Sequence, residues 1–220
     1  MIYWSDTVRV SILISNPEHP VVPRIKAWQR AMTEWAEIDV IHRKSELTRG
    51  DILFLVSCSE LIKPEDRKGY QHTLVLHASD LPTGRGWSPH IWQVIEGASD
   101  ITVSLLEADE PVDTGRIWLK KTFELAPDWL WDEINDALFE TELGLMEEAV
   151  KKLGQITPSK QHETDSSYYR KRTPQDSVLD IDKTIREQFN LLRVCDPQRY
   201  PAMFEIHGKK YKLTVEKVDD

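Results

Sequence analysis

A histidine and an aspartate, each close to the end of an apolar run, are the residues best suited to proton transfer. His77 ends the run Thr73–His77, and residues 78–82 then form a turn. Asp113 lies in a Val-Asp-Thr-Gly turn that follows a second apolar run. A carboxylate beside a histidine orients the imidazole and favours its charged form, which makes a usable acid–base pair. The structural alternative is a hydrogen-bonded histidine at a strand end and an ordinary Asp-Thr-Gly turn.

Other active-site chemistries lack their sequence signatures. The turn at residues 16–20 contains no glycine and therefore no dinucleotide fingerprint, and residues 84–86 lack the third glycine and the lysine of a P-loop. The histidines form no His-Glu-x-x-His pair, and the chain has no Gly-x-Ser-x-Gly elbow. The sequence therefore favours neither zinc chemistry nor a serine nucleophile, and we expect no metal site.

The elements that would position His77 alternate between strands and helices. Apolar runs predict strands at residues 8–14, 38–41, 51–57 and 73–77, and helical spacing predicts helices at 23–35 and 88–95. This alternation predicts an α/β fold with a mostly parallel sheet covered on both faces. Ligands of such sheets bind at the carboxyl ends of the strands, where His77 lies. Period-two alternation places Val75 and His77 on the same face.

The second half of the chain has a different pattern. Strands are predicted at residues 101–106 and 117–123, and Asp128 is predicted to cap a long amphipathic helix that ends near residue 153. A polar surface excursion, a helix at about 181–193 and a hairpin with its turn at His207-Gly208 follow. We therefore predict a core at residues 1–154 and a C-terminal extension at 155–220. The apolar face of the hairpin is compatible with a homodimer or with packing on its own helix layer.

Composition narrows the class of protein. The 220 residues include 37 Asp and Glu against 28 Lys and Arg, for a net charge of −9, which disfavours extended binding to nucleic acid. No apolar run approaches the length of a membrane span, and the first residues lack the features of a signal peptide. Cys58 and Cys195 have no metal or redox spacing. We expect a cytoplasmic globular protein with no membrane or nucleic-acid partner.

The order of the short motifs resembles the folate-dependent formyltransferases. The residues that carry the resemblance are His77-Ala-Ser-Asp-Leu-Pro82, Gly86-Trp-Ser-Pro89, Thr102-Val-Ser104 and Val112-Asp-Thr-Gly115. In the tail, Tyr168-Tyr-Arg-Lys-Arg-Thr-Pro-Gln-Asp176, Asn190-x-x-Arg193 and Asp196-Pro-Gln-Arg-Tyr-Pro201 resemble the sugar-modifying members. The resemblance covers about residues 50–125 and 165–210.

The resemblance implies a Rossmann-like formyltransferase core that moves a formyl group from N10-formyltetrahydrofolate to a primary amine. His77 and Asp113 match the catalytic pair of the family, which would manage the proton of the attacking amine. The resemblance also implies that the folate lies between two loops. The residues assigned to it are Ser57, Cys58, Leu61, Glu107, Ala108, Asp109 and Val112.

One position departs from the family pattern. The family has an asparagine two residues before the histidine, which donates a hydrogen bond to the formyl oxygen, and this chain has Val75 there. Loss of one such donor typically costs about 10²–10³ in rate. Ser79 continues the face of Val75 and His77 and is our candidate for the replacement donor, against the alternative of a hydroxyl that closes the turn. A degenerate folate-binding protein without turnover is the competing interpretation.

The resemblance favours an amino-sugar nucleotide of the 4-amino-4,6-dideoxy type as the formyl acceptor, of the kind used to make pseudaminic- or legionaminic-type surface sugars. Arg85, Arg170 and Arg172 are candidates for binding its diphosphate, and Trp87 for stacking on its base or sugar. The alternative to substrate binding for Arg172 is a structural ion pair with Asp176. Methionyl-tRNA is disfavoured because little more than a hairpin follows residue 200, and glycinamide ribonucleotide stays the alternative small acceptor.

Overall fold

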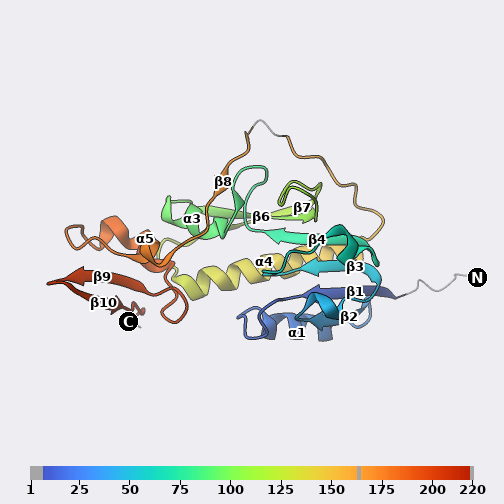
Figure 1. The fold of residues 1–220 in the computed structure, drawn as a ribbon, viewed down its shortest axis with the longest axis horizontal. Helices are drawn as coiled ribbons and strands as arrows, with labels where there is room; N and C mark the ends of the chain where they lie inside the picture. Colours follow the sequence, from blue (N-terminus) through green and yellow to red (C-terminus); the bar gives the residue numbers. More distant parts are fainter. Residues whose placement is uncertain (1–6, 163–164, 219–220) are drawn as a thin grey trace, which may run out of the picture.

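A six-stranded sheet forms the centre of the protein, and the computed structural model describes residues 7–162 and 165–218 (Figure 1). The strand order is β2-β1-β3-β4-β6-β7. The strands span Val8–Leu13 (β1), Ala36–Ile41 (β2), Gly50–Leu55 (β3), Tyr70–His77 (β4), Asp100–Glu107 (β6) and Ile117–Glu124 (β7). Strands β1 to β4 run parallel, whereas β6 is antiparallel to β4 and β7 is antiparallel to β6. The predicted α/β fold with a mostly parallel sheet is confirmed.

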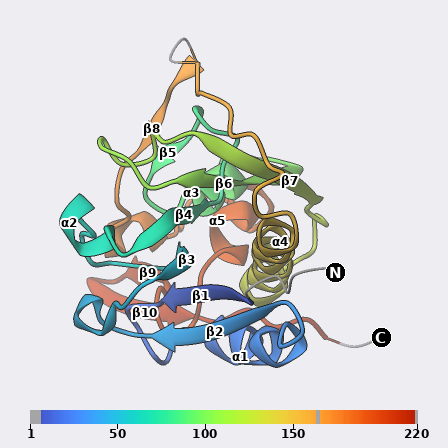
Figure 2. The ribbon, with the colours of Figure 1, turned by 90° about the vertical axis from the view of Figure 1, so that its right-hand side faces the viewer.

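The two faces of the sheet are covered by unlike elements (Figure 2). Helices α1 (Val22–Ala31), α3 (Pro89–Ile95) and α4 (Trp131–Lys151) contribute to one apolar core with alternate residues of the strands. On the opposite face, Leu47, Cys58 and Ile62 pack from the loops beside the short 3₁₀ helix Lys44–Glu46 and the four-residue helix α2 (Pro64–Arg67). The connections on that side are too short to hold a long helix, so this face is covered by loops and short helical turns.

Tyr70, the first residue of β4, packs on this second face of the sheet. Its ring is buried, its hydroxyl donates to Ser11 Oγ at 2.9 Å, and it accepts from the Thr48 backbone N–H at 3.1 Å. We predict that Tyr70→Phe lowers the free energy of unfolding by about 1–3 kcal/mol, because the buried Ser11 hydroxyl loses its donor and the Thr48 N–H loses its acceptor. Denaturant unfolding measures this loss. Tyr211→Phe, in the exposed hairpin, is the control and is expected to leave the free energy of unfolding unchanged.

The start of α4 differs from the prediction. Leu130, not Asp128, occupies the cap position, and its backbone N–H donates to the Glu133 carboxylate at 2.9 Å. Asp128 instead accepts from Lys217 Nζ at 2.9 Å, and the same ammonium group binds Glu133 at 2.7 Å. The carboxylate three residues into the helix satisfies the free N–H group, so the aspartate is released for the ion pair.

Glu142 in α4 carries a carboxyl group that is buried although its side chain is only half-buried overall, and this burial raises its pKa to about 8. A carboxyl with a raised folded-state pKa binds more protons in the folded than in the unfolded state, so stability falls as pH rises toward 8. Burial lowers the pKa of His19 and His90 to about 4, which makes stability change in the opposite direction below about pH 6.5.

We therefore predict that the melting temperature of the protein falls between pH 6.5 and pH 8, and that Glu142→Gln abolishes this fall. Thermal unfolding of both proteins at matched ionic strength measures it. Glu140→Gln, at an exposed position two residues away, is the control and should leave the pH dependence unchanged. A fall of equal size in wild type and Glu142→Gln would contradict the assignment.

The C-terminal segment contains less helix than predicted. A helix over 181–193 is wrong: the structure has a 3₁₀ turn at Arg186–Gln188 and a short α5 at Phe189–Arg193. Side chains bind the backbone just before it, with Asp180 accepting from the Asp182 N–H and Glu187 from the Thr184 N–H. Such local bonds compete with helical ones. The predicted hairpin is confirmed, with β9 (Ala202–Ile206) and β10 (Lys209–Leu213) joined by left-handed residues at the turn.

The segment after α4 returns to the sheet instead of leaving it. Ser159 exchanges two backbone hydrogen bonds with Ile117, and strand β8 (Tyr168–Tyr169) pairs with β5 (Arg85–Gly86). Figure 1 shows this stretch passing over the top of the sheet. The division at residue 154 and the homodimer stay predictions. Within the described ranges, no helix is long and apolar enough to cross a membrane.

Candidate active site

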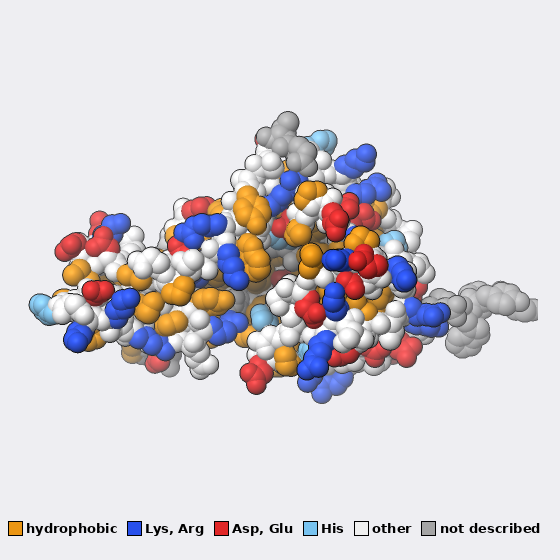
Figure 3. Space-filling view, in the orientation of Figure 1, with side chains coloured by type: hydrophobic (Ala, Val, Ile, Leu, Met, Phe, Trp, Pro, Cys, Tyr) orange, Lys and Arg blue, Asp and Glu red, His pale blue; other side chains and the backbone are white. Residues whose placement is uncertain are grey.

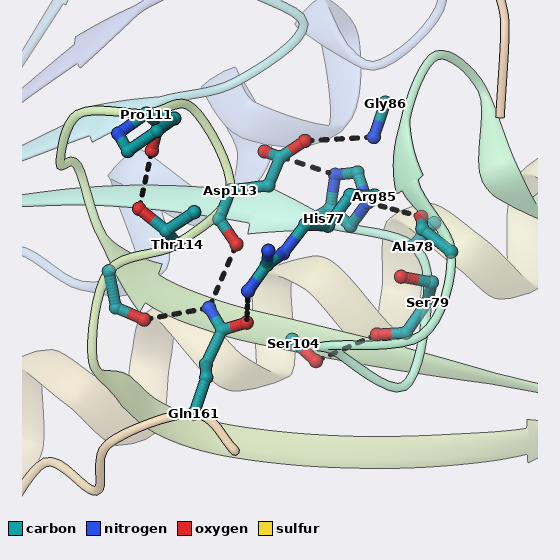
Figure 4. Close-up of polar contacts among 12 residues, drawn as sticks. His77, Ala78, Ser79, Arg85, Gly86, Ser104, Pro111, Asp113, Thr114 and Gln161 are labelled. Carbon is teal, nitrogen blue, oxygen red and sulfur yellow. Dashed lines mark hydrogen bonds and ion pairs between the residues drawn. The ribbon is translucent and has the colours of Figure 1, made fainter. Parts of the chain in front are cut away.

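His77 and Asp113 form a buried pair where β4 ends (Figure 4). Their side chains are 7% and 6% exposed, and His77 Nδ1 lies 3.5 Å from Asp113 Oδ1. On the other side of the ring, His77 Nε2 donates to the Gly84 carbonyl at 2.8 Å. The second carboxylate oxygen of Asp113 accepts from the Gly86 N–H at 2.9 Å. The two residues singled out in the sequence therefore do lie together.

Asp113 reaches His77 by a route that the sequence did not indicate. Because β6 is antiparallel to β4, its last residue Glu107 lies opposite Leu74, away from the end of β4. The loop after β6 therefore has to fold back, and Asp113 adopts a left-handed backbone with φ of 63°. Gly115 makes the return possible, since a Cβ there would lie 1.8 Å from the Glu107 carbonyl oxygen. The pair is built by a folded-back loop and not by two parallel strand ends.

The partners of the His77 ring define where its protons sit. A carbonyl oxygen only accepts hydrogen bonds, so Nε2 carries a proton toward Gly84. Nδ1 faces the Asp113 carboxylate, which also only accepts when ionised. A doubly protonated ring satisfies both neighbours, and the neutral ring leaves Nδ1 free to take a proton. The two forms of the ring therefore differ only at Nδ1, the nitrogen that faces Asp113.

Ser79 is buried in the turn after His77, with 1% of its surface exposed. Its backbone carbonyl accepts from Ser104 Oγ at 2.7 Å. Its own hydroxyl has no hydrogen-bond partner among the residues that the structure describes, and its Cβ lies 2.9 Å from where a Cβ of Gly84 would be. Ser79 is thus next to the residue whose carbonyl holds His77. Val75 packs against Leu81, Leu106 and Ile117 and offers no donor.

The residues predicted to bind the folate lie in the loops after β3 and β6, on either side of β4. Ser57 has a left-handed backbone, Cys58 Sγ donates to the Glu60 carbonyl at 3.5 Å, and Leu61 is 63% exposed. At the end of β6, Glu107 accepts from Trp118 Nε1 at 3.1 Å, and in the loop that follows the Ala108 N–H donates to the Thr73 carbonyl. Asp109 is exposed and accepts from the Glu110 N–H, and Val112 is 66% exposed.

The candidate substrate residues are spread over the neighbouring surface. Trp87 is 46% exposed, with Lys171 Nζ 4.7 Å from its ring centre. Arg85 donates to Gln161 Oε1 at 2.9 Å. Arg170, and not Arg172, pairs with Asp176, so the predicted alternative of an Arg172–Asp176 ion pair is wrong. Arg172 donates to Ser177 Oγ at 2.9 Å and lies 5.9 Å from the Tyr200 ring centre.

Two residues near the pair were not singled out as site residues from the sequence. Gln161 binds the Asp113 loop, but in the sequence it is one more polar residue of a polar run. Burial lowers the pKa of His90, in the first turn of α3, to about 4, and the charges of His77 and Arg172 act in the same direction. His90 is therefore neutral at pH 7. The Ser-Pro helix start just before it was the available signal.

Metal ligands do not gather here. Over residues 7–162 and 165–218, no three His, Cys, Asp or Glu side chains are grouped closely enough to hold a metal ion.

The fold and the pair define an open α/β protein with a buried histidine–aspartate pair at one end of β4. A family model described as "Formyl transferase" matches residues 11–150, a stretch that includes both members of the pair. The chain belongs to the formyl transferase family. The family expected from the motifs is thus confirmed, and with it the expectation of a folate-dependent transferase at the level of the family.

Curated relatives match about two thirds of the chain. Methionyl-tRNA formyltransferase from Desulfotalea psychrophila is 30% identical over 146 residues, which are 65% of this chain and 45% of the relative. The enzyme of the same name from Lachnospira eligens is 32% identical over 141 residues, 63% of this chain and 44% of the relative. The chain thus matches less than half the length of these relatives.

Solved structures share the fold over nearly the whole chain. Methionyl-tRNA formyltransferase from Clostridium thermocellum aligns with a TM-score of 0.82 at 19% identity, covering 96% of this chain and 94% of that one. HypX from Aquifex aeolicus in complex with tetrahydrofolic acid aligns at 0.77 and 22% identity, covering 93% and 37%. The N-formyltransferase from Helicobacter canadensis, in complex with folinic acid and dTDP-3-aminofucose, aligns at 0.70 and 15% identity, covering 92% and 85%. These similarities confirm the Rossmann-like formyltransferase fold.

Proposed function

We propose that this protein transfers a formyl group from N10-formyltetrahydrofolate to the amine of an amino-sugar nucleotide of the 4-amino-4,6-dideoxy type. The observation that carries the transfer is the buried His77–Asp113 pair, 3.5 Å apart, in a chain of the formyl transferase family. Formyl transfer to an amine requires a group that takes the proton of the attacking nitrogen. A histidine next to a carboxylate is suited to that task.

The residues around β4 fit a folate. The loops after β3 and β6 each present an exposed apolar side chain, Leu61 and Val112, and a flat pteridine favours such surfaces. The unpartnered Ser79 hydroxyl, buried among described residues, suits an acceptor brought by a ligand, because a buried hydroxyl without a partner is costly. When bound, the formyl-folate supplies the carbonyl carbon that the amine attacks.

The protein's own groups then move one proton. His77 Nδ1 and the Asp113 carboxylate lie on the side of the ring away from Gly84, where the amine nitrogen loses its proton as it attacks. Asp113 stabilises the imidazolium that results and holds it in orientation. Ser79 donates to the oxygen of the tetrahedral adduct in place of the asparagine that Val75 replaces. His77 finally returns the proton to the departing folate nitrogen.

The choice of acceptor rests on different observations. One structural neighbour is named as a 4-N formyltransferase from Francisella tularensis, which supports a 4-amino acceptor. The Helicobacter canadensis enzyme is named with bound dTDP-3-aminofucose, which supports an amino-sugar nucleotide but not the 4-position. The half-exposed Trp87 and the half-buried Arg172 provide a stacking surface and a cation for a nucleoside diphosphate. The net charge of −9 disfavours a long polyanion.

Methionyl-tRNA is the second candidate, because the curated relatives carry that activity in their names. Glycinamide ribonucleotide and a folate binder without turnover remain the further alternatives. All of them share the folate site and differ only in the acceptor or in the rate.

Mass spectrometry of candidate acceptors incubated with the protein and N10-formyltetrahydrofolate tests the proposal. The set contains UDP- and dTDP-4-amino-4,6-dideoxy sugars, glycinamide ribonucleotide and methionyl-tRNA. A mass increase of one formyl group on a sugar nucleotide alone is the expected result. Formylation of methionyl-tRNA alone would overturn the acceptor and keep the transfer. Folate binding with no product from any acceptor would favour the degenerate binder.

A further inference from the structure

Gln161 connects the two loops that build the catalytic pair (Figure 4). Its side-chain Nε2 donates to the backbone carbonyls of both Asp113 and Gly115, each at 2.8 Å. Its Oε1 accepts from Arg85 Nη2 at 2.9 Å. Arg85 immediately precedes Gly86, whose N–H binds the Asp113 carboxylate. One amide side chain thus joins the backbone of the Asp113 loop to the strand that holds its carboxylate.

The hydrogen bonds from Gln161 hold a backbone turn that has an unfavourable conformation at Asp113. Asp113 has a left-handed backbone, with φ of 63°, which a residue with a Cβ adopts at some cost and keeps only where its surroundings enforce it. The carbonyl of Asp113 is one of the two that Gln161 holds. Gly115, two residues later, is the position where the loop passes within contact of the Glu107 backbone. Gln161 therefore fixes both ends of the turn that carries the catalytic carboxylate.

The orientation of the Gln161 amide is set by its neighbours. Two carbonyl oxygens on one side accept and a guanidinium on the other side donates, so only one of the two amide orientations satisfies all three. Arg85, expected from the resemblance to contact the substrate, here has at least one of its donors bound to Gln161. The stretch that carries Gln161 is further held by the backbone pairing of Ser159 with Ile117.

We propose that Gln161 is a positioning residue for formyl transfer, which sets the Asp113 carboxylate against His77 by holding the backbone turn of Asp113. This inference rests on the proposed function, because its effect on rate is defined only for an active enzyme. Its geometric part concerns the chain alone and is testable without an acceptor.

The kinetic test replaces Gln161 with leucine, which has a similar size and no polar group. We expect kcat to fall by about 10–100-fold, the usual cost of removing a group that orients a catalytic residue, with KM for the formyl donor within about 2-fold of wild type. Lys160→Ala, at the exposed neighbouring position, should leave kcat unchanged. In an Asp113→Asn background, Gln161→Leu should cost less than about 2-fold, because the group it positions is gone.

The loss of equal factors in the wild-type and Asp113→Asn backgrounds would overturn the proposal, since it would show a general structural role. So would an unchanged kcat in Gln161→Leu. If Gln161→Leu fails to fold, Gln161→Glu keeps the size and the acceptor for Arg85 and removes the two donors, and the same outcomes apply.

Amide hydrogen exchange of Gly86 separates this inference from the proposed function. The Gly86 N–H is protected by Asp113 Oδ2, so misplacing Asp113 exposes it. We expect at least about 10-fold faster exchange in Gln161→Leu and no change in Lys160→Ala. If no acceptor is formylated, faster Gly86 exchange still supports the positioning, and unchanged exchange overturns it.

Discussion

Asp113→Asn is expected to lower kcat by about 10³–10⁴, the largest effect of any single substitution in the site. Asparagine keeps the size of aspartate and retains an acceptor for the Gly86 N–H, so the loop should keep its shape. It removes the negative charge 3.5 Å from His77 Nδ1 that stabilises the imidazolium. The amide can also turn its NH₂ group toward His77 Nδ1. The hydrogen bond that it donates then occupies the lone pair that would take up the proton. Turnover of the acceptor identified by mass spectrometry measures the loss.

The comparison needs a control that changes charge elsewhere on the same strand–loop unit. Asp100→Asn, exposed at the far end of β6, removes one carboxylate without touching the pair and should change kcat by less than about 2-fold. The melting temperature of Asp113→Asn should stay near that of wild type. An Asp113→Asn enzyme with more than about a tenth of the wild-type kcat would show that another group takes the proton.

The sequence predicted the pair because its two members are marked by local signals. His77 closes an apolar run at the expected length of a strand, and Asp113 lies in a turn whose glycine is needed for a close backbone approach. The order of the short motifs then matched both residues to the catalytic pair of the formyltransferases. The strand direction was not accessible, since an apolar run reads the same in a parallel and an antiparallel neighbour, and β6 proved to be antiparallel.

The contacts that complete the site could not be predicted because they are made by segments without periodicity. Gln161 lies in a polar run that reads as a surface loop, and strands β5 and β8 are each two residues long. Similarly, Arg170 and Arg172 are equivalent in the sequence, yet only Arg170 reaches Asp176. Which of two neighbouring arginines finds a carboxylate depends on backbone geometry that composition does not encode. The predicted helix at 181–193 is shortened to α5 and a 3₁₀ turn by the same kind of local side-chain bond.

Ser79→Ala is expected to lower kcat by about 10²–10³, the usual cost of one donor to a developing oxyanion. Val75 leaves the site without the amide donor of the family, and the Ser79 hydroxyl is a buried donor next to Gly84 with no partner among the described residues. Because that hydroxyl makes no such bond, its removal should leave the melting temperature unchanged or slightly higher. Activity and stability should therefore change independently, which a turn-closing hydroxyl would not allow.

Restoring the family asparagine provides the decisive comparison. Val75 lies on the same face of β4 as His77, so Val75→Asn should place an amide donor where Ser79→Ala has removed a hydroxyl. In the Ser79→Ala background we expect Val75→Asn to recover at least about 10-fold in kcat, and Val75→Ala to recover nothing. The asparagine lies against Leu81, Leu106 and Ile117, so some loss of stability accompanies the gain. If Ser79→Ala keeps the full rate, Ser79 only closes the turn and the formyl oxygen has another donor. If Val75→Asn raises kcat equally with and without the Ser79 hydroxyl, the two positions act independently. The serine then does not replace the asparagine.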